Sequence, residues 1–193
     1  LKRLKDAGYF VWWGGKNDLV PAQYGFDDHC DIKYKMPPAG DRPTMIEAHG
    51  STDWRGGPED DTYYSFFAGP QQNPDDSPFL YNNDQAMVEG AIDFLHNPPP
   101  EAEGKPLCIY LPLGFPHPPY IVEQGFYDLI DPDAIPDRIP APDDWAGLPS
   151  LLKGIYENQR MQTWTEDRWT DLRRVYYGMC ARVDAQYGMV LDA

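Results

Sequence analysis

The sequence is short of basic residues. Lysine and arginine together number 16 of 193 residues, against 31 aspartates and glutamates, which gives a formal net charge of −15 and an isoelectric point near 4.4. An acidic molecule repels phosphate backbones and anionic lipid headgroups. The composition therefore predicts that neither nucleic acid nor a membrane surface is a partner.

Cysteine is also scarce, and long apolar runs are absent. Cys30, Cys108 and Cys180 form no Cys-x-x-Cys pair and no zinc-ligand spacing, and the sequence has no Asn-x-Ser/Thr glycosylation site. These features favour a reducing compartment such as the cytoplasm. No stretch approaches the roughly 18 apolar residues that a membrane-spanning helix needs, so no transmembrane segment is expected.

Apolar and aromatic residues, in contrast, are plentiful. Hydrophobic residues make up 41% of the chain and aromatic residues 14%, which is too much for a disordered acidic segment. The 21 prolines and 17 glycines predict long ordered loops. The sequence begins without methionine inside one helical pattern and ends inside another, so we expect residues 1–193 to be the central part of a single larger domain, truncated at both ends.

Two apolar runs predict buried strands. Residues 9–13 and 107–113 have strand length and are apolar throughout, which is typical of a parallel sheet covered on both faces. A helix is predicted over residues 1–7. Two further helices are predicted from apolar residues spaced by three and four: Val88, Ala91, Ile92 and Leu95 in the first, and Trp169, Leu172, Tyr176, Met179, Val183, Tyr187 and Val190 in the second.

The remaining segments are irregular in pattern. Residues 21–78 predict hairpins and loops, and residues 121–150 predict a loop rich in proline and aspartate. Strands that alternate with amphipathic helices indicate an α/β fold. The expected fold class is therefore α/β with a mainly parallel sheet and long Pro/Gly/Asp-rich loops.

Two polar side chains follow the predicted strands in tight turns. Lys16 follows Gly14 and Gly15, and His117 lies between prolines in Gly-Phe-Pro-His-Pro-Pro. Ligands bind beyond the carboxyl ends of parallel strands, so an ammonium and an imidazole there would suit a sulfate or phosphate group. Each residue on its own is also compatible with an ordinary solvated loop position.

Four segments, taken in order, resemble the sulfatase family. Residues 4–16 are similar to a helix and strand that lead to Gly-Lys-x-His, and residues 106–120 to a strand and loop written PFFLYLSFPHPP. Residues 128–142 resemble the family's iplP loop, and residues 176–191 resemble the helix before its Asp-Asn-Gly metal motif. The resemblance covers nearly the whole chain and implies an alkaline-phosphatase-like sandwich, incomplete at both ends.

The resemblance implies that Lys16 and His117 bind the sulfate group of a small-molecule or carbohydrate sulfate ester, and that His117 assists departure of the alcohol. The family has histidine two residues after the lysine, whereas this sequence has Asp18. An ionised carboxylate cannot donate to sulfate. Asp18 is therefore expected to orient Lys16, to contact the substrate, or to be a plain loop residue.

The family's nucleophile and metal ligands have no counterpart in these residues. The resemblance implies a formylglycine made from Cys/Ser-x-Pro-x-Arg, and a calcium ion or other divalent cation, but the motif is absent from this sequence. The ligands for both are expected outside this chain. The chain's four acidic pairs are predicted to be solvated loop acids: Asp27-Asp28, Asp60-Asp61, Asp75-Asp76 and Asp143-Asp144.

The sequence thus predicts a sulfuric ester hydrolase, whose isolated fragment is expected to be inactive. A phosphonate or phosphate ester hydrolase of the same superfamily is an alternative, because the lysine and histidine suit either anion. A non-catalytic acidic interaction domain is a second alternative, in which Lys16 and His117 are scaffold residues. The oligomeric state and the identity of the sulfated alcohol stay open.

Overall fold

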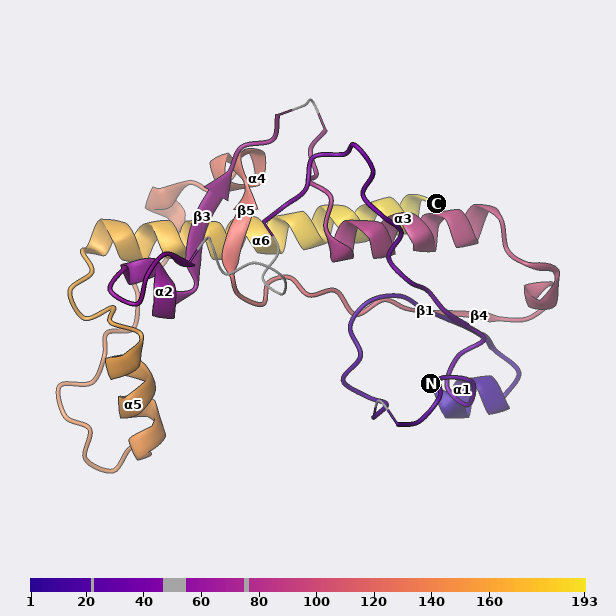
Figure 1. The fold of residues 1–193 in the computed structure, drawn as a ribbon, viewed down its shortest axis with the longest axis horizontal. Coiled ribbons are helices and arrows are strands. Elements are labelled where there is room, and N and C mark those ends of the chain that lie inside the picture. The colour runs from indigo at the N-terminus through magenta and orange to yellow at the C-terminus, as the bar shows by residue number, and fades with distance from the viewer. Residues whose placement is uncertain (22, 47–54, 75–76) are drawn as a thin grey trace. The chain divides into compact units, whose positions relative to one another are not determined.

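The computed structural model describes residues 1–21, 23–46, 55–74 and 77–193 (Figure 1). Its contacts divide the chain into two compact units. Unit 1 comprises Leu1–Met45, Phe79–Phe115 and Val183–Ala193, and unit 2 comprises Ile46–Pro78 and Pro116–Arg182.

Unit 1 is built on a three-stranded parallel sheet. Strand β1 (Phe10–Trp13) lies between β2 (Ile32–Lys33) and β4 (Leu107–Tyr110). The two predicted strands are confirmed, and all four residues of β1 are buried. The expectation that β4 is buried is wrong, because none of its four residues is fully buried and Leu107 is 41% exposed. Within the described residues β4 is an edge strand, and its outer side has no strand neighbour.

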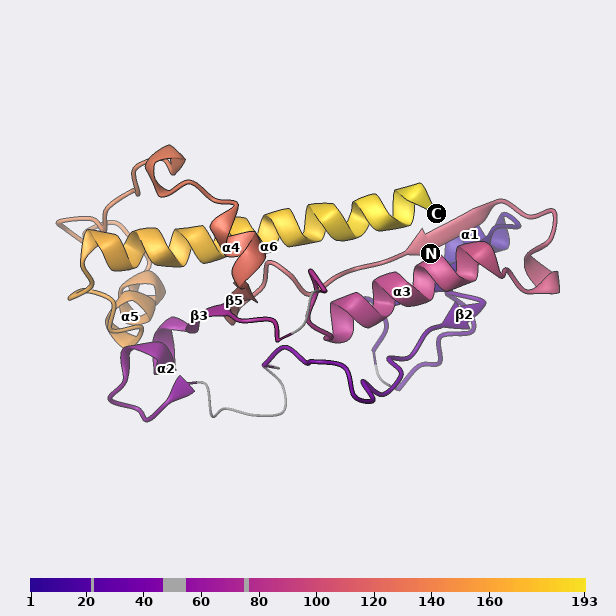
Figure 2. The same ribbon diagram turned by 90° about the horizontal axis from the view of Figure 1, so that it is seen from above.

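Helix α3 (Asn83–His96) covers one face of this sheet (Figure 2). Its predicted amphipathic pattern is confirmed, since Val88 and Ala91 are fully buried and pack in one cluster with Trp12 of β1. The helix begins where the Asn82 side chain accepts a hydrogen bond from the Gln85 backbone N–H at 2.9 Å, which satisfies one of the free donors of the first turn. A short 3-10 helix, Pro100–Ala102, then leads to β4.

The opposite face of the sheet packs on the N-terminal segment, where helix α1 (Lys2–Asp6) confirms the first predicted helix. Val11 and Trp13 are buried there with Cys30. The Lys5 ammonium contacts the Asp31 carboxylate at 3.1 Å and donates to the Cys30 carbonyl at 2.9 Å. Burial would raise the pKa of Asp31, but a hydrogen bond from the Val11 N–H and the Lys5 charge outweigh it and hold the pKa below its usual value.

Unit 2 contains a two-stranded parallel sheet, formed by β3 (Phe67–Gln71) and β5 (Tyr120–Glu123). The helices of unit 2 are α2 (Asp61–Ser65), α4 (Gln124–Asp128), the 3-10 helix Pro132–Ala134 and α5 (Ser150–Asn158). Helix α6 (Glu166–Asp192) begins in unit 2, and its residues from Val183 onward belong to unit 1. The predicted hairpins of residues 21–78 are wrong for the described residues. Both strands in that range, β2 and β3, pair in parallel with strands elsewhere in the chain.

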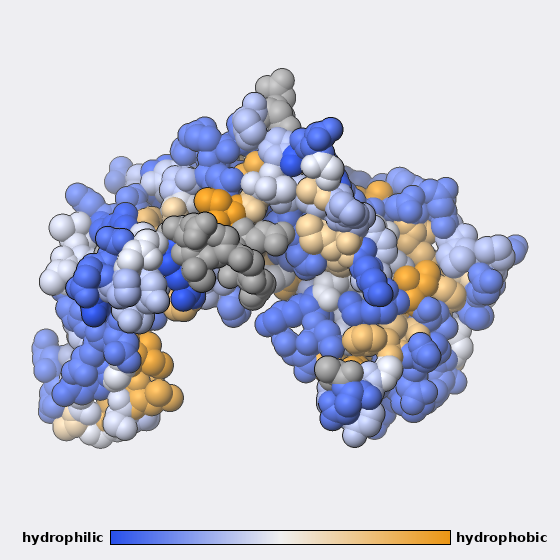
Figure 3. All heavy atoms as spheres, in the orientation of Figure 1, coloured by the Kyte–Doolittle hydropathy of each residue, from blue (hydrophilic) through white to orange (hydrophobic). Residues whose placement is uncertain are grey.

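Helix α5 is the most exposed apolar element of unit 2. Its side chains Leu151, Leu152 and Ile155 are 71%, 47% and 44% exposed. Figure 3 shows apolar surface at the place where Figure 1 draws α5. The helical spacing of Leu151, Leu152 and Ile155 was not used to predict this helix, and the loop predicted for residues 121–150 is wrong where β5 and α4 form.

Helix α6 confirms the last predicted helix, although its buried side differs from the prediction. Tyr176 and Tyr187, both on the predicted apolar side, are 40% and 41% exposed. Met179 is fully buried as predicted, but the other fully buried positions, Val175, Arg182 and Gln186, lie outside the predicted set. Arg182 is buried because it forms an ion pair with Glu123, which apolar spacing cannot reveal.

The α/β class with parallel sheets is confirmed, and the alkaline-phosphatase-like sandwich stays a prediction. Across the described ranges, every helix is too short or too polar to cross a membrane.

Candidate functional site

Lys16 lies at the carboxyl edge of the unit 1 sheet, in a turn that continues the pairing of β1 with β4. The Gly14 N–H donates to the Tyr110 carbonyl at 3.1 Å, and the Lys16 N–H donates to the Pro112 carbonyl at 2.9 Å. Gly15 has a φ of +101°, and a Cβ there would lie 2.3 Å from the Pro112 oxygen. A residue with a side chain fits neither that φ nor that space. We call Gly14, Gly15 and Lys16 the lysine turn.

Two further hydrogen bonds hold the carbonyl groups of the lysine turn. The Trp13 indole Nε1–H donates to the Lys16 carbonyl at 3.2 Å. The Lys33 ammonium donates to the Gly15 carbonyl at 3.1 Å. The main chain at Gly15 and Lys16 is therefore fixed by β1, β2 and β4 together, before any ligand binds.

The Lys16 side chain itself points to solvent. Its ammonium lies 2.9 Å from the Asp18 carboxylate, and the two side chains are 51% and 70% exposed. Exposed ion pairs of this kind contribute at most about 1 kcal/mol, so an incoming anion can replace the carboxylate. Of the three roles expected for Asp18, orienting Lys16 is the one that the geometry favours.

The chain leaving β4, residues 111–115, is held by two side chains of unit 1. The Asp84 carboxylate, buried to 3% exposure, accepts hydrogen bonds from the Gly114 N–H at 2.7 Å and the Phe115 N–H at 2.9 Å. The Tyr187 hydroxyl donates to the Leu111 carbonyl at 2.9 Å. Burial raises the pKa of Tyr187, and the negative charge of Asp84 raises it further.

These two contacts were missed by sequence reasoning. Asn82 caps α3, whereas the Asp84 carboxylate holds a segment thirty residues further along the chain. The signal available was a carboxylate in the first turn of a helix, which favours hydrogen bonding to backbone N–H groups. That signal does not say which N–H groups are reached.

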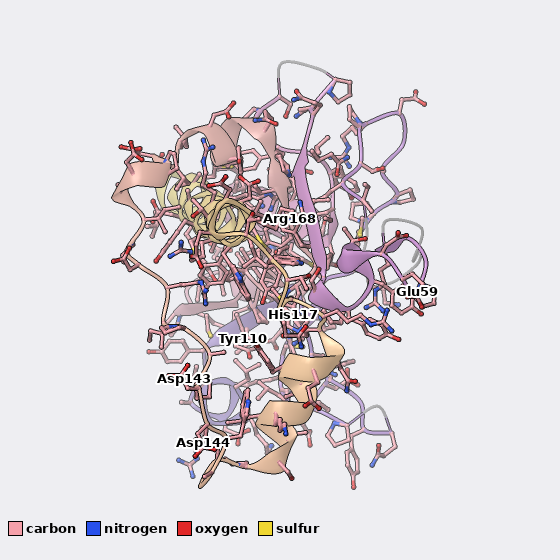
Figure 4. All side chains as sticks on the ribbon, turned by 90° about the vertical axis from the view of Figure 1, so that its left-hand side faces the viewer. Glu59, Tyr110, His117, Asp143, Asp144 and Arg168 are labelled. Atoms are coloured by element: carbon pink, nitrogen blue, oxygen red, sulfur yellow. The ribbon has the colours of Figure 1, made fainter. Side chains whose placement is uncertain are left out.

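His117 lies in unit 2, two residues after the segment that Asp84 holds, and its ring is exposed (Figure 4). Its Nδ1–H donates to the Pro118 carbonyl at 2.7 Å. This contact requires the proton on Nδ1, so Nε2 carries a proton only when the ring is cationic. The following peptide bond, Pro118–Pro119, is cis.

Lys16 and His117 therefore belong to different units. His117 follows Pro112, whose carbonyl accepts the Lys16 N–H, by five positions in the chain. The expectation that the lysine and histidine share one anion site stays a prediction.

The acidic pairs do not gather into a metal site in the part of the chain that the structure describes. Asp27 and Asp28 are exposed, and so are Asp143 and Asp144 in the loop before α5 (Figure 4). The Asp60 carboxylate is engaged by the Gly57 N–H, and the pair at 75–76 lies outside the described residues. No group of three or more His, Cys, Asp or Glu side chains there could hold a metal ion.

Cys30 and Cys180 do not have the character of activated nucleophiles. Burial raises the pKa of the Cys30 thiol, although Lys5 and Lys33 lower it in part. Burial likewise raises the pKa of Cys180. A reactive thiolate needs the opposite shift.

A second polar cluster lines a cavity of about 530 Å³ in unit 2. The Arg138 guanidinium forms a two-pronged pair with the Glu166 carboxylate at 2.6–3.0 Å, and this pair raises the pKa of Arg138 and lowers that of Glu166. Arg173 donates to the Pro136 carbonyl. Both arginines are thus engaged by protein groups, so this cavity is a weaker candidate for an anion than the lysine turn.

The comparisons with known proteins identify no relative. No protein-family model matches the chain, and no curated protein matches it. The resemblance to sulfatases therefore rests on the sequence segments alone.

Proposed function

We propose that this chain is the central part of a sulfatase, an enzyme that hydrolyses a sulfate monoester of a small molecule or carbohydrate. The observation that carries the proposal is the lysine turn. It places an accessible ammonium at the carboxyl edge of a parallel sheet, where ligands of such sheets bind, and its main chain is already fixed.

Lys16 would bind the non-bridging oxygens of the sulfate group. Its ammonium is a compact charge with three N–H donors, and it stabilises the negative charge that builds on the equatorial oxygens as sulfur is attacked. Asp18, 2.9 Å away, would hold the ammonium in place in the free protein and release it to the substrate.

His117 would act on the bridging oxygen. Because its Nδ1–H is engaged by the Pro118 carbonyl, the group available to the substrate is Nε2. In the imidazolium form, Nε2–H donates its proton to the departing alkoxide as the sulfur–oxygen ester bond breaks, and the alcohol leaves neutral.

The nucleophile and the divalent cation are expected from residues outside these 193. The resemblance implies that the nucleophile would supply the oxygen that attacks sulfur. The cation would supply further positive charge beside the sulfate oxygens. The roles given to Lys16 and His117 do not depend on where the nucleophile and the cation lie.

Turnover distinguishes the proposal from the first alternative. A protein containing this chain together with the nucleophile motif is expected to hydrolyse p-nitrophenyl sulfate faster than bis-p-nitrophenyl phosphate or a phosphonate monoester. The reverse preference would favour a phosphonate or phosphate ester hydrolase.

Substitution of Lys16 tests the second alternative. Lys16→Ala is expected to lower kcat/KM by about 100-fold or more, the effect of removing one preorganised charge from an oxyanion site. Lys35→Ala is the matched control, because Lys35 is an exposed lysine of the same unit and should change turnover less than twofold. Equal turnover in both variants would indicate the non-catalytic interaction domain.

A further inference from the structure

We propose that Lys33 is a second cation of the anion site at the lysine turn, and that it binds a tetrahedral oxyanion together with Lys16. The inference rests on the proposed function, which it deepens by adding a residue that neither the sequence patterns nor the resemblance assigns.

The topology places both lysines at one sheet edge. Lys33 is the last residue of β2, and its register partner in the parallel neighbour β1 is Trp13. Lys16 follows Trp13 by three residues. Since parallel strands end at the same edge, the two lysines leave the sheet on the side where ligands bind.

One carbonyl group joins the two positions. The Lys33 ammonium lies 3.1 Å from the Gly15 oxygen, and the peptide unit of Gly15 continues directly into Lys16. An ammonium has three N–H donors, so the hydrogen bond to Gly15 leaves donors for a ligand.

The charge of Lys33 is not balanced by a neighbouring carboxylate. Within the described residues, Lys5 and Lys16 pair with Asp31 and Asp18, whereas the contacts of Lys33 are the Gly15 carbonyl and the rings of Trp13 and Phe26 at 4.9 and 5.7 Å. This absence is notable in a chain with a net charge of −15.

The surroundings of Lys33 favour an added anion. The side chain is half-buried, and burial lowers its pKa, with the Cys30 thiol opposing the shift. A half-buried ammonium lacks part of its hydration. A bound oxyanion would restore the lost charge stabilisation, whereas a purely structural lysine would need only the Gly15 carbonyl.

The test is a titration of the 193-residue chain with sodium sulfate, followed by the NMR signals of the lysine side chains. In the unmodified chain, sulfate is expected to shift the Cε signals of both Lys16 and Lys33. Lys33→Met is expected to weaken sulfate binding about tenfold, equivalent to about 1.4 kcal/mol. Lys35→Met, the exposed control two residues away, should weaken it less than twofold.

The salt dependence of sulfate binding distinguishes loss of the Lys33 charge from displacement of the lysine turn. Loss of a cation lowers the slope of log Kd against log salt, whereas a merely displaced turn leaves the slope unchanged. Lys33→Arg keeps the charge and is expected to bind sulfate with a Kd within about threefold of that of the unmodified chain. That change in binding free energy is less than half of the loss expected for Lys33→Met. These variants are compared only after their melting curves show them folded, and the Cε shift of Lys33 in the unmodified chain decides the question if Lys33→Met unfolds.

The outcomes for the two proposals differ. If Lys16→Met weakens binding but Lys33→Met matches Lys35→Met, the role of Lys33 is overturned and the proposed function stands. If Lys33→Met weakens binding but Lys16→Met does not, Lys33 binds anions without Lys16, and both the shared site and the proposed role of Lys16 are wrong. Absence of any sulfate-induced shift at either lysine overturns both proposals.

Discussion

The lysine turn of unit 1 and the histidine segment of unit 2 hold their side chains in different ways. The main chain at Gly15 and Lys16 is hydrogen-bonded to residues from three neighbouring segments. The ring of His117, in contrast, is engaged by the carbonyl of the next residue. The lysine is thus presented by the sheet, and the histidine by its own loop.

The interiors of the two units also differ. Unit 1 buries Trp12 and Trp13 on opposite faces of β1, and each buried tryptophan contributes roughly 2–3 kcal/mol through apolar burial. Unit 2 buries an ion pair, since Arg182 Nε lies 3.0 Å from both carboxylate oxygens of Glu123 and the two side chains are 0% and 2% exposed. Apolar periodicity therefore describes unit 1 better than unit 2.

The largest effect is expected from breaking the ion pair. Arg182→Met leaves the Glu123 carboxylate buried without its guanidinium, which costs about 3–5 kcal/mol of the free energy of unfolding. Replacing both residues by methionine should restore most of that loss. Urea denaturation followed by circular dichroism measures both variants.

An exposed pair provides the control for this measurement. Arg138→Met breaks the pair with Glu166, whose side chain is 68% exposed, and should change stability little. If Arg182→Met and Arg138→Met destabilise the protein equally, the buried pair does not distinguish unit 2 from unit 1.

An intermediate effect is expected from Gly15→Ala in the lysine turn. Alanine at a φ of +101° costs about 1–3 kcal/mol, and its Cβ would also contact the Pro112 oxygen. Gly8→Ala is the matched control, because Gly8 has a φ of +91° with no atom within 4 Å of the added Cβ. Thermal denaturation should therefore show a greater loss for Gly15→Ala. Equal losses would mean that the close approach to β4 contributes nothing.

The smallest effect is expected from acid titration of Asp31 in unit 1. The pKa of this carboxyl is held below its usual value of 3.8, so its ionised form stabilises the folded state above that pH, and the stabilisation is lost as pH falls through the lowered pKa. Asp31→Asn should lower stability at pH 7 and have little effect in strong acid. A difference between variant and parent that is independent of pH would contradict this linkage.

Much of unit 1 could be predicted because apolar side chains determine it. The run ending in Trp12 and Trp13 predicted β1, and the spacing of Val88 and Ala91 predicted α3. Strand β2 was missed because two residues carry no periodicity, and its pairing depends on contacts made by β1. Lys33 was missed for the same reason, since its place beside Gly15 follows from β2.

Unit 2 was less predictable in part because its interior includes a buried ion pair. The buried side of α6 includes Arg182, and only the presence of Glu123 on β5 makes that burial favourable. A similar limit applies in unit 1 to Asp84, whose partners Gly114 and Phe115 are far away in sequence. Patterns within one segment predict elements, but these contacts between charged side chains and distant segments come from the fold.

The lysine turn also makes residue 16 unusually suitable for chemical replacement. The hydrogen bonds that define the turn use the main chain of Gly14, Gly15 and Lys16 and the side chains of other residues. A different side chain at position 16 can therefore be introduced while the backbone keeps its shape. Lys16→Cys, alkylated with bromoethylamine, would return a sulfur-containing ammonium to the same place, and the recovery of anion binding would report on that one charge.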